Sequence, residues 1–474
     1  MHDFDLLLRA KRTSQRQPMR SVGDPERKSR WTGNHKCTSN ESEPIGGAAQ
    51  EPMAQYSNQP LGVSTSEGAH HFAVTSLDRW LVRKILAAAP DMPISIELWN
   101  GEVIKPQHVT LRSGIRLNSR RALLQLIRHP TLNFGDLYCA GDLEVQGDLS
   151  DLLLLVRPPV TGVPDTLMGL WRRLCWRNVR PRTASVDQAR DNIHHHYDLG
   201  NDFYALWLDQ PAMQYTCAYF PNPAMTLEAA QTAKMHHVCR KLRLQPGQAV
   251  VEAGCGWGGF ALFMAREYGV DVRAYNISHE QIVYARNQAQ AQGLADSVEF
   301  IEDDYRNIEG ECDVFVSVGM LEHVGLQNYR ALGEVIDRIL HQRGLGLIHS
   351  IGRNVPLKMN AWIEKRIFPG AYTPTLSEMA DIFDPGELSI LDVENLRLHY
   401  ARTLEHWLSR FEGHIDEVTK RFDESFVRAW RLYLTGSRTA FLNGDMQLFQ
   451  VLFSRARNND MTWSRVHLYG DADC

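Results

Sequence analysis

The sequence lacks paired cysteines, long apolar runs and an excess of basic residues. Its eight cysteines are scattered through 474 residues with no Cys-x-x-Cys spacing, which indicates reduced thiols rather than a disulfide framework. No segment approaches the ~20 consecutive apolar residues of a membrane-spanning helix, and the N-terminal residues lack the apolar stretch of a secretory signal. The formal net charge of −5 excludes a globally basic nucleic-acid binder. These absences favour a cytoplasmic protein that binds no nucleic acid.

Length and composition predict two folded domains and a tail. A chain of 474 residues exceeds the usual size of a single hydrophobic core. Hydrophobic residues make up 43% and charged residues 23%, as in ordinary globular proteins. We expect a disordered tail at 1–65, an N-terminal domain at 66–165, a linker at 166–190 and a catalytic domain at 191–474.

Two arginine-rich segments suggest contact with an anionic membrane. The tail is rich in Ser, Gly, Pro and Gln and has too little apolar surface to offset the entropy of ordering. Its first part carries the basic residues Arg9, Lys11, Arg12, Arg16, Arg20, Arg27, Lys28 and Arg30. Residues 170–182 interleave two tryptophans with five arginines, a composition that suits a membrane interface. A solvated tail and a packed linker helix are the alternatives. We expect peripheral contact at the inner face of the membrane.

The segment after residue 70 predicts a small α+β domain. A helical stretch at Leu77–Ile85 is followed by the alternating segment Ile94–Leu98 and then by an Asn100-Gly101 hairpin signal. Between residues 135 and 149, glycines stand beside aspartates, a composition typical of turns rather than of a reaction centre.

From residue 249 onward, expected strands alternate with expected helices. The strands are 249–253, 270–275, 298–301, 314–318 and 346–349, and the helices are 260–268, 278–292 and 329–340. This alternation predicts a doubly wound, Rossmann-like α/β sheet, in which ligands bind at the carboxyl ends of the strands. Near the C-terminus, Phe422–Phe453 carries apolar residues at helical spacing and is interpreted as a helix packed on the sheet.

A glycine-rich turn directly follows the first of these strands and opens a helix. Its glycines allow close approach of a ligand to the backbone, and helix N-terminal amides can bind polar ligand atoms. The Gly-x-Gly-x-Gly form suits S-adenosylmethionine, which has no pyrophosphate to hold. The expected contacts in the turn are Glu252, Gly254, Cys255, Gly256, Trp257 and Gly258.

Polar residues also follow the second and third strands. The expected cofactor contacts there are Asn276, Ile277, Ser278, Gln281, Asp304 and Tyr305. Gln281 suits a ribose or methionine contact, and an acid after the third strand can accept a hydrogen bond from the adenine amine. Helix capping by Ser278 and a solvated loop at the acids are the alternative interpretations.

Five motifs, in order, resemble the cyclopropane fatty acid synthases and the related mycolic acid cyclopropane synthases. They occupy 196–204, 213–219, 252–259, 319–325 and 368–374, and the resemblance extends from about residue 90 to 460. It implies a class I S-adenosylmethionine methyltransferase sheet and adds Tyr215 and Thr216 to the expected cofactor contacts. Residues 98–101 and 135–149 are similar to the family's N-terminal lipid-binding domain.

The resemblance also implies a reaction. In that family the double bond of a phospholipid acyl chain attacks the sulfonium methyl group, and bound bicarbonate then removes a methyl proton so that a cyclopropane ring closes. The bicarbonate ligands implied here are the backbones of Cys217 and Ile351 and the side chains of Glu322, His349 and Tyr400. Burying a carboxylate such as Glu322 costs several kcal/mol unless it is paired or hydrogen-bonded.

Other residues leave alternatives open. The rings of Tyr215, Tyr219, Tyr305 and Tyr372 suit either cation stabilisation or ordinary core packing. Three adjacent histidines at 194–196 cannot converge easily on one ion, so we predict no metal site.

Three residues depart from the family pattern; the first two leave room for an altered product or substrate, and the third argues against thiol chemistry. They are Asn276, Ala371 and Ser437, the last standing where many relatives have a cysteine. A lipid C-methyltransferase that forms a branch, an amine N-methyltransferase and a non-enzymatic lipid-binding module are the competing functions. A homodimer is compatible with the sequence.

Overall fold

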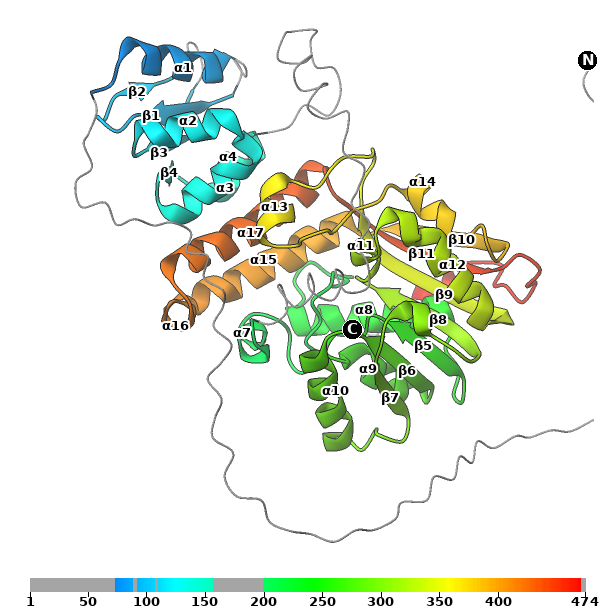
Figure 1. Cartoon of the computed structure of the whole chain (residues 1–474). Coiled ribbons are helices and arrows are strands. Elements are labelled where there is room, and N and C mark those ends of the chain that lie inside the picture. Colours follow the sequence, from blue (N-terminus) through cyan, green and yellow to red (C-terminus); the bar gives the residue numbers. More distant parts are fainter. Residues whose placement is uncertain (1–72, 88–91, 107–109, 157–198, 470–474) are drawn as a thin grey trace, which may run out of the picture. The chain divides into compact units, whose positions relative to one another are not determined.

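A computed structural model describes residues 73–87, 92–106, 110–156 and 199–469 (Figure 1). The predicted tail at 1–65, the linker at 166–190 with its Trp- and Arg-rich segment, and the three histidines at 194–196 lie outside the described residues. Within the described ranges, no helix is both long and apolar enough to cross a membrane.

The first described unit is a four-stranded sheet with four helices. The strands, in the order β2-β1-β3-β4, are β1 (Ile94–Glu97), β2 (Val103–Ile104), β3 (Ser113–Leu117) and β4 (Leu143–Gln146). The helices are α1 (Ser76–Ala87), α2 (Arg120–Arg128), α3 (Pro130–Ala140) and α4 (Leu149–Leu155). The predicted hairpin is confirmed, because β1 and β2 pair antiparallel and Gly101 has a φ of +84°, a conformation that glycine adopts without strain.

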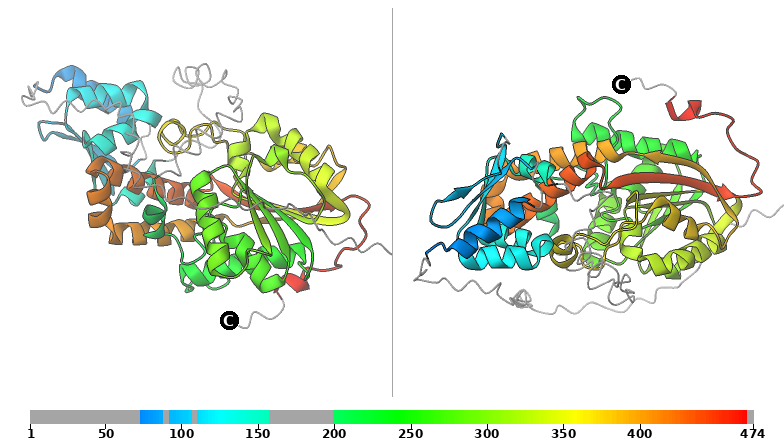
Figure 2. Two further views of the ribbon diagram at one scale, coloured as in Figure 1. Left: turned by 60° about the horizontal axis from the view of Figure 1, so that its bottom comes forward. Right: turned by 90° about the horizontal axis from the view of Figure 1, so that it is seen from above.

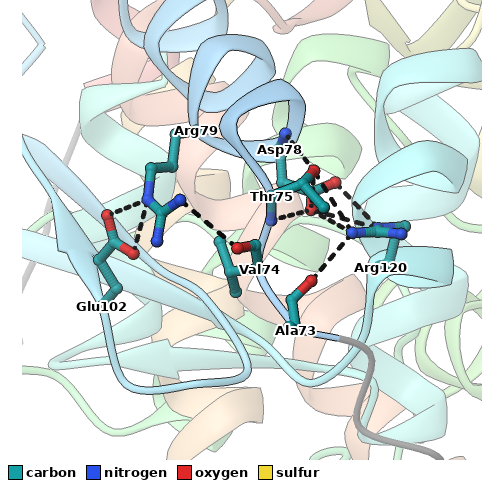
Figure 3. Close-up of polar contacts among 7 residues, drawn as sticks. All are labelled: Ala73, Val74, Thr75, Asp78, Arg79, Glu102 and Arg120. Carbon is teal, nitrogen blue, oxygen red and sulfur yellow. Dashed lines mark hydrogen bonds and ion pairs between the residues drawn. The ribbon is translucent and has the colours of Figure 1, made fainter.

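Two ion pairs hold α1 against the rest of this unit (Figure 3). The buried carboxylate of Asp78 accepts hydrogen bonds from the backbone and hydroxyl of Thr75, both at 2.8 Å, and from Arg120 Nη2 at 2.6 Å. Burial raises the pKa of Asp78, but these hydrogen bonds outweigh it and lower the pKa overall. On the other side, Arg79 Nε lies 2.8 Å from Glu102 Oε1.

A seven-stranded sheet forms the second unit (Figures 1 and 2). In the order β10-β11-β9-β8-β5-β6-β7, its strands are β10 (Leu388–Asn395), β11 (Gln447–Arg455), β9 (Leu340–Gly352), β8 (Cys312–Val318), β5 (Ala249–Ala253), β6 (Asp271–Asn276) and β7 (Val298–Glu302). Strands β9 to β7 are parallel, whereas β11 is antiparallel to both of its neighbours. The predicted doubly wound α/β sheet is confirmed.

Helices cover both faces of this sheet. The α-helices are α7 (Asn201–Ala205), α8 (Leu227–Leu242), α9 (Gly259–Tyr268), α10 (His279–Ala291), α11 (Leu321–Val324), α12 (Tyr329–Ile339), α13 (Ala361–Arg366), α14 (Leu376–Met379), α15 (Arg397–Gly413), α16 (Ile415–Arg421), α17 (Glu424–Asn443) and α18 (Val466–Tyr469). Short 3₁₀ turns occupy Tyr305–Asn307, Leu326–Asn328 and Ala380–Ile382. Neighbouring residues of β5 enter different cores, since Val250 packs with α8, α9 and α10 whereas Val251 packs with α12.

The prediction of a helix at Phe422–Phe453 is wrong beyond Asn443. The helix α17 ends at Asn443, Gly444 follows with a φ of +83°, and β11 begins at Gln447. Strand β11 is an interior strand whose register pairs Gln450 with His349 of β9. Burial on both faces gives this strand neighbouring apolar residues, Leu448 and Phe449 and then Val451 to Phe453, and such a segment resembles a buried helix in sequence.

Candidate functional site

Two adjoining cavities open at the carboxyl ends of β5, β6 and β7, and together we call them the cofactor cleft. Their volumes are about 530 and 730 Å³ with the open solvent at their mouths included. The larger is lined by Met213, Gln214, Tyr215, Thr216, Glu252, Gly254, Cys255, Gly256, Trp257, Phe260, Asn276, Gln281, Val318, Gly319, Met320 and His323. The smaller adds Tyr275, Ile277, Asp303, Asp304, Tyr305, Arg306 and Val324. Every predicted cofactor contact except Gly258 and Ser278 lines the cleft.

The glycine-rich turn gives the cleft its floor. Amides of Gly254 and Cys255 donate to the carbonyl of Tyr275, at 2.9 and 3.0 Å, and so fasten the end of β5 to β6. At Gly254 the φ is +85°, and a Cβ there would lie 2.8 Å from the Cβ of Met320. Gly258 lies under the turn, where a Cβ would lie 2.6 Å from the ring of Phe300. Both glycines are therefore required by shape.

A buried acid and a buried lysine lie behind the turn. The Oε2 atom of Glu252 has no hydrogen-bond partner among the described residues, and burial raises the pKa of this carboxyl to about 8. Lys234 of α8 donates to Thr216 Oγ1 at 3.0 Å and to Gln214, and burial lowers its pKa to about 8. An unpaired acceptor at the cleft suits the ammonium group of a methionine moiety.

The loop after β6 is ordered by its own side chains. Asn276 Nδ2 donates to Gln281 Oε1 at 2.8 Å and to the carbonyl of Gly256 at 3.2 Å. Ser278 caps α10, where its hydroxyl accepts from the backbone of Gln281 at 3.5 Å. The capping interpretation of Ser278 is thus confirmed, whereas Gln281 lines the cleft.

The loop after β7 is held by an ion pair. Asp304 Oδ1 accepts from Arg306 Nε at 2.7 Å, and Oδ2 accepts from Arg306 Nη2 at 2.9 Å. The hydroxyl of Tyr305 is buried with no hydrogen-bond partner in the part of the chain described, and burial raises the pKa of Tyr305 to about 12. Both residues line the smaller cavity, and an adenine contact stays a prediction.

Two of the implied bicarbonate ligands, Glu322 and Ile351, are in direct contact beside this cleft, and the others lie on neighbouring elements. We call Cys217, Glu322, His349, Ile351 and Tyr400 the reactive cluster. Glu322 Oε1 accepts from the backbone amide of Ile351 at 2.6 Å, and the amide of Gly319, which lines the cleft, donates to the carbonyl of His349 at 2.9 Å. Glu322 follows Met320 and precedes His323, both lining the cleft. The cluster therefore borders the cofactor cleft.

Cys217 and Tyr400 join the cluster from other elements. The thiol of Cys217 lies 3.9 Å from the carbonyl oxygen of Leu396. The amide of Leu396 donates to the carbonyl of Leu448 at 2.8 Å, and Leu448 pairs with Ile351 across the sheet. Tyr400 lies in the first turn of α15, and its amide donates to the carbonyl of Leu396 at 3.2 Å. Burial raises the pKa of the Cys217 thiol, so this side chain is an inert neutral group.

Two buried atoms of the cluster are available to a ligand. Oε2 of Glu322 and Nε2 of His349 have no hydrogen-bond partner within the described ranges. Burial raises the pKa of Glu322 to about 7, although the hydrogen bond from Ile351 opposes the shift. Burial also lowers the pKa of His349 to about 3, so this imidazole is neutral near pH 7. Buried polar atoms of native proteins are ordinarily hydrogen-bonded, so each of these two atoms needs a partner, which a small anion beside the cleft would provide.

The sequence analysis missed three residues of the site, of which one could have been found. His323 lines both cavities and stands next to Glu322, so its position in the motif could have found it. Lys234 and Gln231 lie on α8 and hold the loop before Cys217 in place. In a helix, such polar residues ordinarily face solvent.

The remaining aromatic candidates differ in their surroundings. Tyr215 lines the cleft, and its hydroxyl lies 2.7 Å from that of Tyr433. Tyr219 instead stacks on His237 with ring centroids 4.2 Å apart, and the hydroxyl of Tyr372 donates to Glu378 at 2.8 Å. Both therefore have packing or hydrogen-bonding roles of their own.

The strand order, the glycine-rich turn after β5 and the cleft at the strand ends define a class I S-adenosylmethionine-dependent methyltransferase. Residues 184–451 match the family model described as mycolic acid cyclopropane synthetase, and residues 81–157 match a model described as a domain of unknown function. The chain belongs to the mycolic acid cyclopropane synthetase family, as the motifs predicted.

Individual relatives cover different shares of the chain. A probable fatty acid methyltransferase of Pseudomonas putida is 35% identical over 395 residues, 80% of this chain and 96% of that protein. The cyclopropane-fatty-acyl-phospholipid synthase of Escherichia coli strain K12 is 41% identical over 271 residues, 57% of this chain and 69% of that protein. The crystal structure of mycolic acid cyclopropane synthase CmaA1 complexed with SAH and CTAB is 28% identical, with a TM-score of 0.53, and the match covers 56% of this chain and 98% of that one.

Proposed function

We propose that this enzyme is a cyclopropane-fatty-acyl-phospholipid synthase. It transfers a methylene group from S-adenosylmethionine to the cis double bond of a phospholipid acyl chain, with bicarbonate as the proton acceptor. The observation that carries the proposal is the pair of unpartnered buried atoms, Glu322 Oε2 and His349 Nε2, which lie beside the cofactor cleft and have no partner among the described residues.

The reacting groups would divide between the cleft and the cluster. In the cleft, Glu252 and Gln281 hold the methionine and ribose parts of the cofactor, and the loop after β7 holds the adenine. An alkene is a weak nucleophile, so its carbon must be held against the methyl group in a dry site before the carbon–sulfur bond breaks. Two tyrosines that line the cleft, Tyr215 and Tyr305, are suited to stabilise positive charge.

The reactive cluster fits a small oxyanion that carries one proton. Bound bicarbonate would supply a base for the methyl proton whose loss closes the ring. Glu322 Oε2 would accept the proton of its hydroxyl group, while Nε2 of His349 and the backbone of Cys217 stabilise its negative charge. Preorganised donors of this kind contribute strongly in a site that excludes water.

Relatives support the choice of a lipid substrate. The Escherichia coli relative is named for a phospholipid acyl product, and its match covers 57% of this chain. For the N-terminal domain, we propose a lipid-binding role at 66–165. We also propose that the enzyme works as a peripheral protein at the inner face of the membrane.

The test is expression in a bacterium that lacks cyclopropane lipids, followed by mass spectrometry of its fatty acids. We expect acyl chains that are heavier by one methylene group and resist catalytic hydrogenation under conditions that saturate double bonds. The Glu322→Gln variant, expressed at the same level, is the matched control and is expected to leave the lipids unmodified. Unchanged lipids with soluble wild-type protein would refute the proposal.

A second candidate is a lipid C-methyltransferase that forms a methyl or methylene branch. It is favoured by the Pseudomonas putida relative, which is named a probable fatty acid methyltransferase and is covered over 96% of its length. The same experiment separates the two reactions. Loss of a proton from the methylated cation leaves a branched product with one double bond, either in a methylene branch or in the chain beside a methyl branch. Either branched product takes up hydrogen, whereas a ring does not.

A further inference from the structure

A chain of buried hydrogen bonds runs from α8 through β11 to the imidazole of His349. Lys241 Nζ of α8 lies 2.8 Å from Gln450 Oε1, and Gln450 Nε2 lies 3.1 Å from His349 Nδ1. The sheet register places Gln450 directly opposite His349. All three side chains are shielded from water, with 1%, 0% and 2% of their surfaces exposed.

The chemistry of Lys241 decides the direction of every bond in this chain. An ammonium group only donates, so the amide atom that faces it must be the oxygen of Gln450. The NH₂ group of Gln450 therefore faces His349 and donates to Nδ1. A neutral imidazole that accepts at Nδ1 carries its proton on Nε2.

Burial lowers the pKa of Lys241, whereas its acidic neighbours Glu394 and Asp392 oppose that shift and favour the cationic form. Its ammonium donates at 2.6 Å to Glu394 Oε2, which also accepts from His237 Nε2 at 2.7 Å, and Asp392 lies 4.0 Å away. Burial raises the pKa of Glu394, but hydrogen bonds from His237 and Lys241 outweigh it and hold that pKa at about 2. The charge that orients Gln450 is thus held in place by a carboxylate.

We propose that Lys241 and Gln450 are positioning residues that lock His349 in the Nε2–H tautomer, so that it serves as a hydrogen-bond donor to the bound anion and not as a base. This inference rests on the proposed function, because bicarbonate is the anion of the proposed reaction. It assigns the proton of the methyl group to the anion and its partner Glu322. His349 has no lone pair left for that proton, because Nδ1 is used by Gln450.

The other neutral tautomer of His349, with its proton on Nδ1, would be unfavourable in either orientation of the Gln450 side-chain amide. A proton on Nδ1 would face the NH₂ group of Gln450, and rotation of the amide would turn that group against the ammonium of Lys241. Either arrangement places two donors face to face in a site without water, where an unpaired buried donor is costly. A neutral His349 with the proton on Nε2 avoids both.

The test is an NMR measurement on the full chain labelled with [¹⁵N]histidine, without ligands. The signals of His349 are identified by their loss in His349→Asn. We expect a proton-bearing shift at Nε2 and a lone-pair shift at Nδ1 near pH 7. The reverse pattern, or protons on both nitrogens, would overturn the proposal.

Gln450→Glu replaces the donor that faces His349 Nδ1 by an acceptor, with almost no change in the shape of the side chain. A carboxylate at 450 still accepts from Lys241 but can only accept from His349, so Nδ1 must take up the proton. Nε2 then faces the anion with a lone pair, and we expect half-maximal turnover to need about tenfold more bicarbonate or more. If Nδ1 still lacked a proton in this variant, the proposal that Gln450 sets the tautomer of His349 would be overturned.

Gln450→Met is the matched control, because it fills the space without imposing either tautomer. Its bicarbonate requirement should lie between those of the wild type and Gln450→Glu, and calorimetry should give all three the same affinity for S-adenosylmethionine. A requirement in Gln450→Glu equal to that of the wild type would refute the donor role. If wild-type turnover did not depend on bicarbonate, the role of bicarbonate in the proposed function would be refuted. If the NMR pattern were nevertheless the expected one, the inference about the tautomer of His349 would still hold.

Discussion

The cofactor cleft and the reactive cluster lie at the same edge of one sheet and are built by different means. In the cleft, the backbone provides the shape: Gly254, Gly256 and Gly258 all have positive φ angles, and two of them allow no Cβ. In the reactive cluster, buried polar side chains provide the chemistry. Glu322 and His349 depend on partners that come from β9, β11 and α8.

This difference predicts how each region fails. A side chain added in the cleft collides with neighbouring atoms, so the cofactor should be lost first. A polar atom removed from the cluster leaves the fold and the cleft in place, so turnover should fall while the cofactor still binds. Measuring affinity and turnover in the same variants therefore separates the two regions.

Gly254→Ala should have the largest effect on the affinity for the cofactor. The added methyl group would lie 2.8 Å from Met320 Cβ at a backbone φ of +85°, and overpacking together with left-handed strain costs about 3 kcal/mol. If the loop shifts to relieve this strain, the cleft changes shape, and the dissociation constant for S-adenosylmethionine should rise roughly 100-fold. Isothermal titration calorimetry measures this change.

Gly256→Ala is the matched control for that variant. Its φ is +54°, and no atom of the described chain lies within 4 Å of the position where a Cβ would stand. Within the protein only the left-handed conformation then carries a cost, about 1 kcal/mol, so the free energy of unfolding should fall less than in Gly254→Ala. Because Gly256 itself lines the cleft, the two variants are compared by unfolding, and equal losses of stability would contradict the role of the Met320 contact.

Glu322→Gln should lower turnover by about 10²–10³-fold and leave the affinity for S-adenosylmethionine unchanged. The amide keeps an oxygen for the Ile351 amide, but it cannot take up a proton, and losses of this size are typical for one electrostatic group at a reaction centre. Quenched assays at saturating cofactor measure the rate. Weakened cofactor binding in this variant would show that the two regions are not separate.

The pH dependence of the wild type sharpens the same point. Burial raises the pKa of Glu322 from 4.5 to about 7, so the carboxyl is protonated below that pH and cannot accept a proton. Turnover should therefore rise as pH increases through about 7. The assay needs a constant concentration of bicarbonate ion and saturating cofactor. Glu322→Gln should lack this rise, and a rise that persists in the variant would assign it to another group.

Sequence patterns predicted the two regions unequally for the same physical reason. The turn around Gly254 is local, since a strand, a glycine-rich turn and a helix follow one another, so spacing predicted this part of the cleft, whereas Tyr215 and Thr216 were found through the family resemblance. Glu322 and His349 were found through family motifs. Lys241 and Gln450 could not be predicted, because a lysine on α8 resembles a solvated residue and β11 resembled the continuation of a helix. Lys241 and Gln450 reach His349 only because β11 pairs with β9 in the folded sheet.

Ser278→Ala should have the smallest effect, because Ser278 shapes the cleft without lining it. Its hydroxyl caps α10 through a long hydrogen bond of 3.5 Å, so loss of the cap should lower the free energy of unfolding by about 0.5–1 kcal/mol. Ser278→Gly is the control, since glycine is tolerated at this position and should restore most of that stability. Neither variant should change the affinity for S-adenosylmethionine more than about twofold, because the free-energy differences involved are below about 1 kcal/mol. If both variants lost the cofactor equally, the hydroxyl would be a ligand, and the cleft would rely on side chains as well as on backbone shape.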